Sequence, residues 1–282
     1  MTSEARQVKQ GISARILRAM SPALWVAAAC VAVIFFCAIG GSSVAPGSPD
    51  VQRLLVGDTP PSMEFWAGTD KLGRDVMART VAGARTALIG PTVVAAGAFT
   101  IATVLGLLAG YFGGWVDSVI MRGVDIILAL PGPLIAIVVV GVTGGGYWTA
   151  VGVLVALFVA PDTRIVRSAV LVQRSQPYIE AARIQNIPRH RILFVHILPN
   201  VMPIILSYAV LDFAFALVNL AGLSFLGLGV EPGTADWGRM LFENRNILFT
   251  NPAALLVPAA MIVITAGSIN MLGDRLREVM AK

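Results

Sequence analysis

Charged residues are missing from several long stretches of this chain. A helix needs about 20 apolar residues to cross a hydrocarbon core of roughly 30 Å, and each of these stretches is at least that long. The charge-free intervals are 19–49, 86–116, 126–161 and 246–273. A further interval, 192–230, contains Asp212 as its one charged residue. This pattern is typical of a protein that crosses a membrane several times.

The interval 126–161 is too long for one span. The run Thr143-Gly144-Gly145-Gly146 divides it and predicts a turn. The stretches lack the two-residue alternation of membrane barrel strands. They therefore predict an all-α membrane protein with six transmembrane helices, over about 22–40, 86–111, 126–142, 147–165, 201–226 and 252–272.

Composition agrees with this pattern, because 56% of the 282 residues are hydrophobic and only 13% are charged, with a mean hydropathy of +0.78. We divide the chain into a cytoplasmic segment 1–21, a first span 22–40 and an extracytoplasmic loop 41–85. A transmembrane core then covers 86–273 and includes a long cytoplasmic loop 173–199, and a cytoplasmic tail covers 274–282. A cleaved signal peptide is the alternative for the N-terminal region, but its apolar block is longer than usual, which favours an uncleaved span.

Basic residues give the expected orientation. With the N-terminus inside, 14 of the 21 Lys and Arg residues lie on the cytoplasmic side, and cytoplasmic loops are enriched in these residues. The net charge of +5 is therefore a topology signal, and we do not expect nucleic-acid binding. Both termini are predicted to be cytoplasmic. The outer side receives seven: Arg53, Lys71, Arg74, Arg79, Arg85, Arg239 and Arg245.

The sequence contains few groups for catalysis. It has no Gly-x-x-x-x-Gly-Lys-Ser/Thr loop for nucleotide phosphates. Its two histidines, His190 and His196, have no partners at metal-ligand spacing. We therefore expect no catalytic residue, no metal and no cofactor. Asp212 and Asn219 are candidate polar residues of a transport pathway, although Asp212 could instead be satisfied by a neighbouring helix.

The cytoplasmic loop carries the clearest local signals. Pro177 suits the first position of a helix, and Glu180 favours the positive end of its dipole. Ala181 and Ala182 offer a small, flat surface. Asn186 can adopt the left-handed conformation that ends a helix.

Pro188 then starts a second short helix, which is predicted to stop near Pro199. Two short helices would meet at a corner that could seat in a groove of another protein. The alternative is a helix lying among lipid headgroups.

These residues also resemble a family. Glu180-Ala181-Ala182, followed at the right distance by Ile197-Leu198-Pro199, looks like the EAA loop of ABC importer permeases. Four more motifs resemble the dipeptide/oligopeptide/nickel permeases in particular, and the resemblance covers about 64–278. They are Gly68-Thr69-Asp70-Lys71-Leu72-Gly73-Arg74-Asp75, Ala109-Gly110-Tyr111-Phe112-Gly113-Gly114-Trp115-Val116-Asp117, His196-Ile197-Leu198-Pro199-Asn200 and Ser224-Phe225-Leu226-Gly227-Leu228-Gly229.

The resemblance implies the type I ABC importer permease fold and a bacterial inner-membrane location. It implies four kinds of partner: a homologous permease subunit, two cytoplasmic ATPase domains, an extracytoplasmic solute-binding protein and a di- or oligopeptide substrate. Nickel chelates or glutathione are alternative cargoes within the same family. The residues that match the family's ATPase-coupling segment are Glu180, Ala181, Ala182, Asn186, Ile187 and Pro199.

Two departures from the family pattern stand out. Asn186 occupies a position where the family usually has Gly, and Leu220 aligns with a position where many relatives carry Glu, so no polar role transfers there. Other classes remain possible from the residues alone. A self-sufficient ion-coupled carrier needs more intramembrane coupling groups than Asp212, and its usual internal repeat is not evident. An intramembrane enzyme needs a nucleophile–base pair.

Two segments have competing interpretations. Val76, Met77 and Ala84 recur at helical steps opposite Arg74 and Arg79, which predicts an amphipathic helix at the outer interface. It would either contact the binding protein or a gate, or simply lead into the second span. Pro131 and Pro133 are expected to kink the third span.

Overall fold

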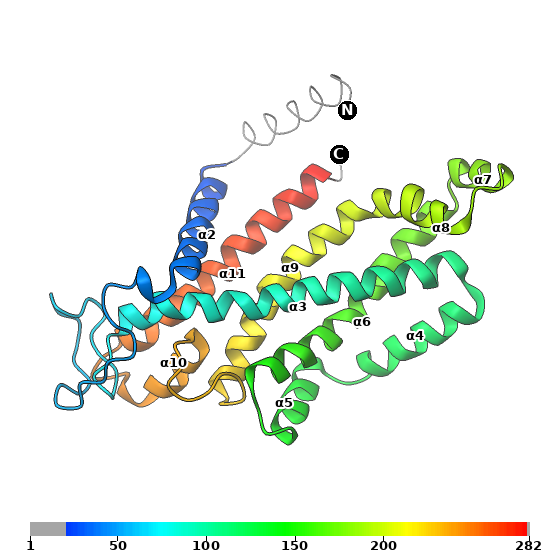
Figure 1. The fold of residues 1–282 in the computed structure, drawn as a ribbon. Coiled ribbons are helices and arrows are strands. Elements are labelled where there is room, and N and C mark those ends of the chain that lie inside the picture. Colours follow the sequence, from blue (N-terminus) through cyan, green and yellow to red (C-terminus); the bar gives the residue numbers. More distant parts are fainter. Residues whose placement is uncertain (1–20, 281–282) are drawn as a thin grey trace.

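The computed structural model describes residues 21–280, and they form a bundle of long helices (Figure 1). α2 covers Pro22–Gly40 and a 3₁₀ turn follows at Gly41–Ser43. A non-helical segment leads to α3 (Val76–Phe112), which is followed by α4 (Gly114–Leu128), α5 (Gly132–Val142) and α6 (Tyr147–Arg174). Within the described residues no strand forms, apart from an isolated bridge between Thr69 and Asp75.

The second half of the chain begins with the short helices α7 (Pro177–Ile184) and α8 (Arg189–Arg191). A π-helical turn, Ile192–Ile197, joins α8 to α9 (Leu198–Phe225). α10 covers Trp237–Asn244 and is followed by a 3₁₀ turn at Arg245–Ile247. The last helix, α11, covers Ala253–Met280.

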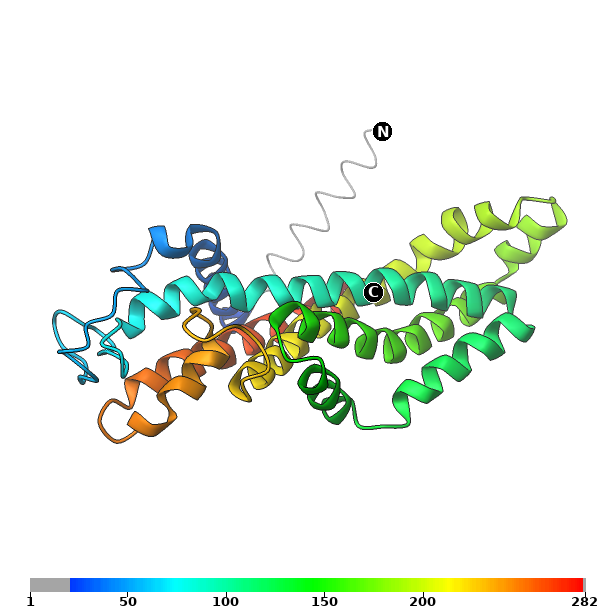
Figure 2. The same ribbon diagram turned by 60° about the horizontal axis from the view of Figure 1, so that its bottom comes forward.

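α3 is the longest helix of the described chain and packs against both α6 and α9, as the two views show (Figures 1 and 2). Asp75 caps its N-terminus, because the Asp75 carboxylate accepts hydrogen bonds from the amides of Met77 (2.8 Å) and Ala78 (3.1 Å). Loop 44–75 and α10 lie at one end of the bundle, and α7 lies at the opposite end (Figure 1).

Small residues let α3 approach α6 closely. A methyl group added to Gly106 would lie 2.5 Å from Cβ of Val166, and one added to Gly110 would lie 2.8 Å from Cβ of Val170. Ala98 and Ala102, which precede them at four-residue steps, are fully buried. This is the small-residue spacing that allows helices to pack tightly in membranes, where burial against lipid supplies little driving force.

Five helical segments are long and apolar enough to cross a membrane, and the described chain reaches six if the bent pair α4–α5 counts as one span. The predicted spans at 22–40, 147–165, 201–226 and 252–272 correspond to α2, α6, α9 and α11. Each of these helices except α2 extends beyond the predicted range by several residues at one end.

The predicted third span, 126–142, is wrong as one kinked helix. α4 starts twelve residues earlier, at Gly114, and stops at Leu128; α5 begins at Gly132, bent by 80° from α4. Pro131 is the physical cause, because proline disfavours helical geometry in the residue before it and sits instead at the cap of the next helix. The chain therefore breaks where we expected a kink.

The predicted boundary between an interfacial helix and a second span at residue 86 is also absent. α3 runs without interruption from Val76 through the predicted span. Arg74 and Arg79, which were expected to face water, are 4% and 1% exposed. The segment is therefore not an amphipathic surface helix, because its polar side is buried in the protein.

Candidate functional site

The end of the bundle that contains α7 forms an elbow, which we define as residues 177–198. Pro177 occupies the first turn of α7, as predicted, and Glu180 is exposed in that turn. Asn186 has a φ of 56° and is the one non-glycine residue with positive φ in residues 21–280. It closes the helix as predicted, with the Ile187 amide donating to the Ala182 carbonyl at 3.1 Å.

Packing fixes the elbow against the rest of the bundle. Ile179 is fully buried and Ala182 is 6% exposed, and both join an apolar cluster with Val166 and Val170 of α6 and Ile192. The expected flat surface of two alanines is therefore wrong for Ala182, whose small size serves the packing of this chain. Of the residues that match the coupling segment, Glu180, Ala181, Asn186 and Pro199 are exposed and Ile187 is partly buried.

The second arm of the elbow is longer than predicted. α8, the π-helical turn and α9 form one helical run from Arg189 to Phe225, so the helix does not stop near Pro199. Pro199 is the second residue of α9 and directly follows the π-helical turn, so a carbonyl of that turn lacks the amide donor of an uninterrupted helix. The elbow is thus one short helix, joined through the non-helical corner 185–188 to a helical run that continues into α9.

Two carboxylates meet inside the spans, at the contact between α6 and α9. Asp162 and Asp212 are each 7% exposed and lie close enough to interact directly. They line a cavity of about 10 Å³ together with Tyr208, and no donor among the described residues reaches Oδ2 of Asp212. Asp212 thus packs against a neighbouring helix, but the polar group that it meets there is another acid, and the choice between its two interpretations stays a prediction.

Sequence reasoning missed Asp162. It closes the charge-free interval 126–161 and is followed two residues later by Arg164, so it resembled the start of a polar loop. The predicted helix 147–165 already included Asp162, and this placement within a span was the signal that could have identified it as an intramembrane acid. Asn219, by contrast, lies apart from this pair. It is partly exposed, and its side-chain amide donates to the Phe215 carbonyl of its own helix at 2.8 Å.

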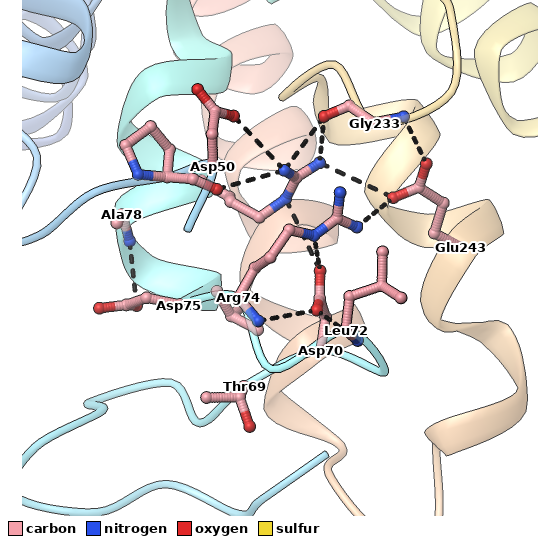
Figure 3. A network of polar contacts seen from close by, with 12 residues as sticks. Asp50, Thr69, Asp70, Leu72, Arg74, Asp75, Ala78, Gly233 and Glu243 are labelled. Atoms are coloured by element: carbon pink, nitrogen blue, oxygen red, sulfur yellow. Dashed lines mark hydrogen bonds and ion pairs between the residues drawn. The ribbon is translucent and has the colours of Figure 1, made fainter. Parts of the chain in front are cut away.

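A buried ionic network occupies the opposite end of the bundle (Figure 3). Arg74 contacts Asp70 at 2.6 Å and Glu243 at 2.8 Å. Arg79 lies 3.8 Å from Asp70 and 3.7 Å from Glu243, and also donates to the Gly233 carbonyl at 3.1 Å. Arg239 also contacts Glu243, at 3.0 Å. The buried Asp70 and the partly buried Glu243 are thus shared among three arginines, and neither of the buried arginines, Arg74 and Arg79, is left unpaired.

The network joins segments that are far apart in sequence. The turn 70–74 and the start of α3 are held to α10 and the loop before it. Trp237 of α10 is fully buried and donates from its indole to the Thr80 carbonyl at 2.8 Å. Gly73 (φ 70°) permits the turn, because a side chain there would meet the Arg53 carbonyl oxygen at 2.1 Å. These contacts form a rigid cap over this end of the helices.

The pKa values of two carboxyl groups shift in opposite directions here: that of Asp236, the N-cap of α10, and that of Glu243, within α10. Burial raises the pKa of Asp236, despite hydrogen bonds from the Arg239 amide and Ser224. Burial also opposes the charged form of Glu243, but hydrogen bonds from Gly233, Arg239 and Arg74 outweigh it and lower the Glu243 pKa. Glu243 is therefore held as a carboxylate that stabilises the cap.

Solved structures with the same architecture define the class of fold. Two chains from inward-facing conformations of the MetNI methionine ABC transporter superpose with TM-scores of 0.60 and 0.59, at 19% and 18% identity. Each superposition covers 73% of this chain and 98% of the other. The chain has the fold of a type I ABC importer permease.

Sequence comparison places the chain within that class. Residues 102–282 match the family described as binding-protein-dependent transport system inner membrane component, and the chain belongs to this family. It is 40% identical to the dipeptide transport system permease protein DppC of Alkalihalophilus pseudofirmus, over 78% of this chain and 72% of that protein. It is also 40% identical to the glutathione transport system permease protein GsiD of Pectobacterium atrosepticum, over 82% and 76%.

The di/tripeptide transport system permease protein DppC of Pseudomonas aeruginosa is 36% identical, over 88% of this chain and 84% of that protein. The family resemblance of the motifs is thus confirmed. The chain is a multi-pass inner-membrane protein and the non-catalytic membrane component of an ABC importer.

Proposed function

We propose that this chain is one of two homologous permease subunits in an ATP-driven importer of di- or oligopeptides. It forms half of the pathway and receives peptide from an extracytoplasmic solute-binding protein. The observation that carries the substrate class is the similarity, at 36% to 40% identity over most of the chain, to permeases named for dipeptides and di/tripeptides. A relative named for glutathione is as similar, so glutathione, itself a small peptide, is the second candidate.

The elbow is the proposed contact with a cytoplasmic ATPase domain. Glu180, Ala181 and Asn186 form its exposed surface, and Ile179 and Ala182 attach it to α6 from below. Because the second arm continues into α9, closure of the two ATPase domains would tilt α9 together with α7. Coupling of this kind requires a bundle with two arrangements, whose equilibrium the nucleotide biases. No residue of this chain hydrolyses ATP in this scheme.

Asn219 is a proposed polar residue of the pathway, because its side chain is partly exposed and, among residues 21–280, its amide oxygen accepts no hydrogen bond from the protein. Asp212 has a different proposed role. Its carboxyl group lies beside that of Asp162, so a proton shared between the two acids would hold α9 against α6, whereas two charged carboxylates would repel each other. Both roles concern residues within spans, where polar groups are costly and usually functional.

The substrate is tested by purifying the complex with an affinity tag on this chain, capturing the solute-binding protein that the complex retains, and identifying its bound solute by mass spectrometry. We expect di- or tripeptides. Glutathione alone would select the second candidate, and a nickel chelate would contradict the peptide assignment.

The orientation is tested by single-cysteine labelling at Ser48, Gln185 and Thr234, which are all exposed, after replacing Cys30 and Cys37. Positions 48 and 234 should react with an impermeant reagent from outside, and position 185 only after the membrane is opened. Labelling of position 185 from outside would contradict cytoplasmic termini.

A further inference from the structure

Three arginines surround a cavity of about 540 Å³ at the base of the elbow. Arg174 ends α6, Arg183 lies in the last turn of α7 and Arg189 begins α8. They therefore come from both arms of the elbow and from the helix before it. The cavity wall includes no Asp or Glu side chain, so the positive charges face one another across an open space.

In the described part of the chain, two other arginines of α6 have acidic partners, unlike the three arginines around the cavity. Arg167 contacts Asp117 of α4 at 2.5 Å, and Arg164 forms an ion pair with Asp125. Among residues 21–280, no carboxylate lies within ion-pair distance of Arg174, Arg183 or Arg189. Among the described residues, the chain thus supplies acids for the arginines about two and three turns before Arg174 in α6 and none for the three around the cavity.

Two of these guanidinium groups are held in place by other contacts. Arg174 donates to the Gly110 carbonyl at 3.4 Å, near the C-terminus of α3, where a cation also complements the helix dipole. Arg183 stacks over the ring of Tyr111, with 5.5 Å from its guanidinium carbon to the ring centroid. One carbonyl and one ring leave most of their N–H donors unused. The dipole explains the position of Arg174 but not the convergence of all three.

The chemistry and size of the space indicate its ligand. Guanidinium groups present a planar fork of donors that matches phosphate oxygens. The volume lies within the range of about 300–1,000 Å³ that is typical of small-molecule sites and far exceeds one carboxylate side chain. Ile187 and Ile192 add an apolar wall beside the arginines, which suits a ligand with both an anionic and an apolar part.

We propose that this cavity binds a phosphate group, supplied either by the headgroup of an anionic phospholipid or by a soluble phosphate compound. The proposal goes beyond the proposed transport function and shares with it the cytoplasmic placement of the elbow, where the inner leaflet is negatively charged. A bound phosphate would tie α6, α7 and α8 together and stiffen the elbow against which an ATPase would push.

The first experiment places the full-length chain in nanodiscs of phosphatidylcholine with a minority of phosphatidylglycerol. Native mass spectrometry then counts the lipids that stay bound when the protein is released from the nanodisc. We expect selective retention of phosphatidylglycerol. Each single Arg→Gln change at 174, 183 or 189 should weaken it about fivefold, the contribution of one arginine near an anionic surface. Arg191→Gln is the matched control, because Arg191 is exposed on the same elbow and does not line the cavity; it should retain the lipid as before.

The second experiment uses nanodiscs of phosphatidylcholine alone and compares the thermal stability of the protein in inorganic phosphate and in chloride at equal ionic strength. If phosphate stabilises the wild type and not the three variants while the first experiment shows no preference for phosphatidylglycerol, that result would support the site and assign a soluble source of the phosphate. Arg→Lys variants, which keep the charge, should bind more weakly than wild type but better than the Gln variants.

The proposal is overturned if wild type and the Gln variants retain phosphatidylglycerol equally and phosphate stabilises neither. It is also overturned if the variants lose only their co-purification with the ATPase, since the arginines would then belong to that contact. Neither experiment measures transport, so failure of the peptide assignment would leave their results unaffected.

Discussion

Replacing Asn186 with valine should impair transport, whereas replacing it with glycine should not. Asn186 has a φ of 56°, in the left-handed region that costs an ordinary L-residue roughly 1–2 kcal/mol and costs glycine nothing. Asparagine tolerates this region better than most residues, and a β-branched side chain tolerates it worst. The residue is exposed, so a change there alters the direction of the chain without disturbing the core.

The expected size follows from that backbone cost. A penalty of about 1–2 kcal/mol reduces the population of the correct elbow by a factor of roughly 5–30. The assay is ATP-dependent uptake at matched membrane levels of Asn186→Gly, Asn186→Val and the control Gln185→Val. Gln185 precedes the corner, is exposed and has an ordinary φ of −75°. We expect near-normal uptake for the glycine variant and the control, and a several-fold loss for Asn186→Val. Equal uptake by all three would refute the reasoning, because the left-handed corner would then have no effect on coupling.

The remaining predictions concern packing, pH and the two alanines. Gly106→Val should destabilise the folded protein by about 1–3 kcal/mol and lower its amount in the membrane, because the Cβ atom of the new side chain would lie 2.5 Å from Val166 of α6. Gly152→Val is the control, since no atom lies within 4 Å of a Cβ placed there. The Glu243 pKa is lowered in the folded protein, so its contribution to stability is present above the unfolded value of about 4.3 and is lost as pH falls through the folded value; Glu243→Gln should be less stable at pH 7 and show a weaker acid dependence in thermal melts, and an unchanged melt at pH 7 would contradict the network. Ala182→Trp should reduce the amount of folded protein, whereas Ala181→Trp should leave it folded and weaken only ATPase co-purification; the reverse order would contradict the burial pattern.

The apolar stretches were sufficient to predict most of the bundle. α2, α9 and α11 arise from long charge-poor runs, and lipid gives such runs one stable arrangement, the helix. The corner at Asn186 was also predictable, because few residues besides glycine accept that conformation. Local chemistry decides both features, so they can be derived from neighbouring residues.

The features that sequence reasoning missed depend on distant partners. Arg74 and Arg79 look like a solvated helix face until Glu243, 169 and 164 residues later, is brought against them. Asp162 looks like the start of a loop until α9 places Asp212 beside it. Ala182 looks like part of a docking surface until α6 covers it. In each case a distant segment of the chain buries the residue, and the spacing of apolar residues within one segment carries no information about that partner.

The break between α4 and α5 has a local cause, but its size does not follow from that cause. Pro131 predicts a disturbance in the residues before it, and this was expected as a kink. An 80° turn also depends on how α5 packs against α6, where Val140 of α5 and Val151 of α6 join the same apolar cluster. The direction of a broken helix is thus a property of the assembled bundle.

We infer that this chain transports only as part of an ATP-driven complex. The direct measurement is uptake of a radiolabelled dipeptide into proteoliposomes that contain this chain alone, or this chain with its partner permease, ATPase subunits and solute-binding protein. We predict uptake only in the complete system and only with ATP. Uptake by the chain alone under an ion gradient would contradict the ATP-driven assignment and favour a self-sufficient carrier.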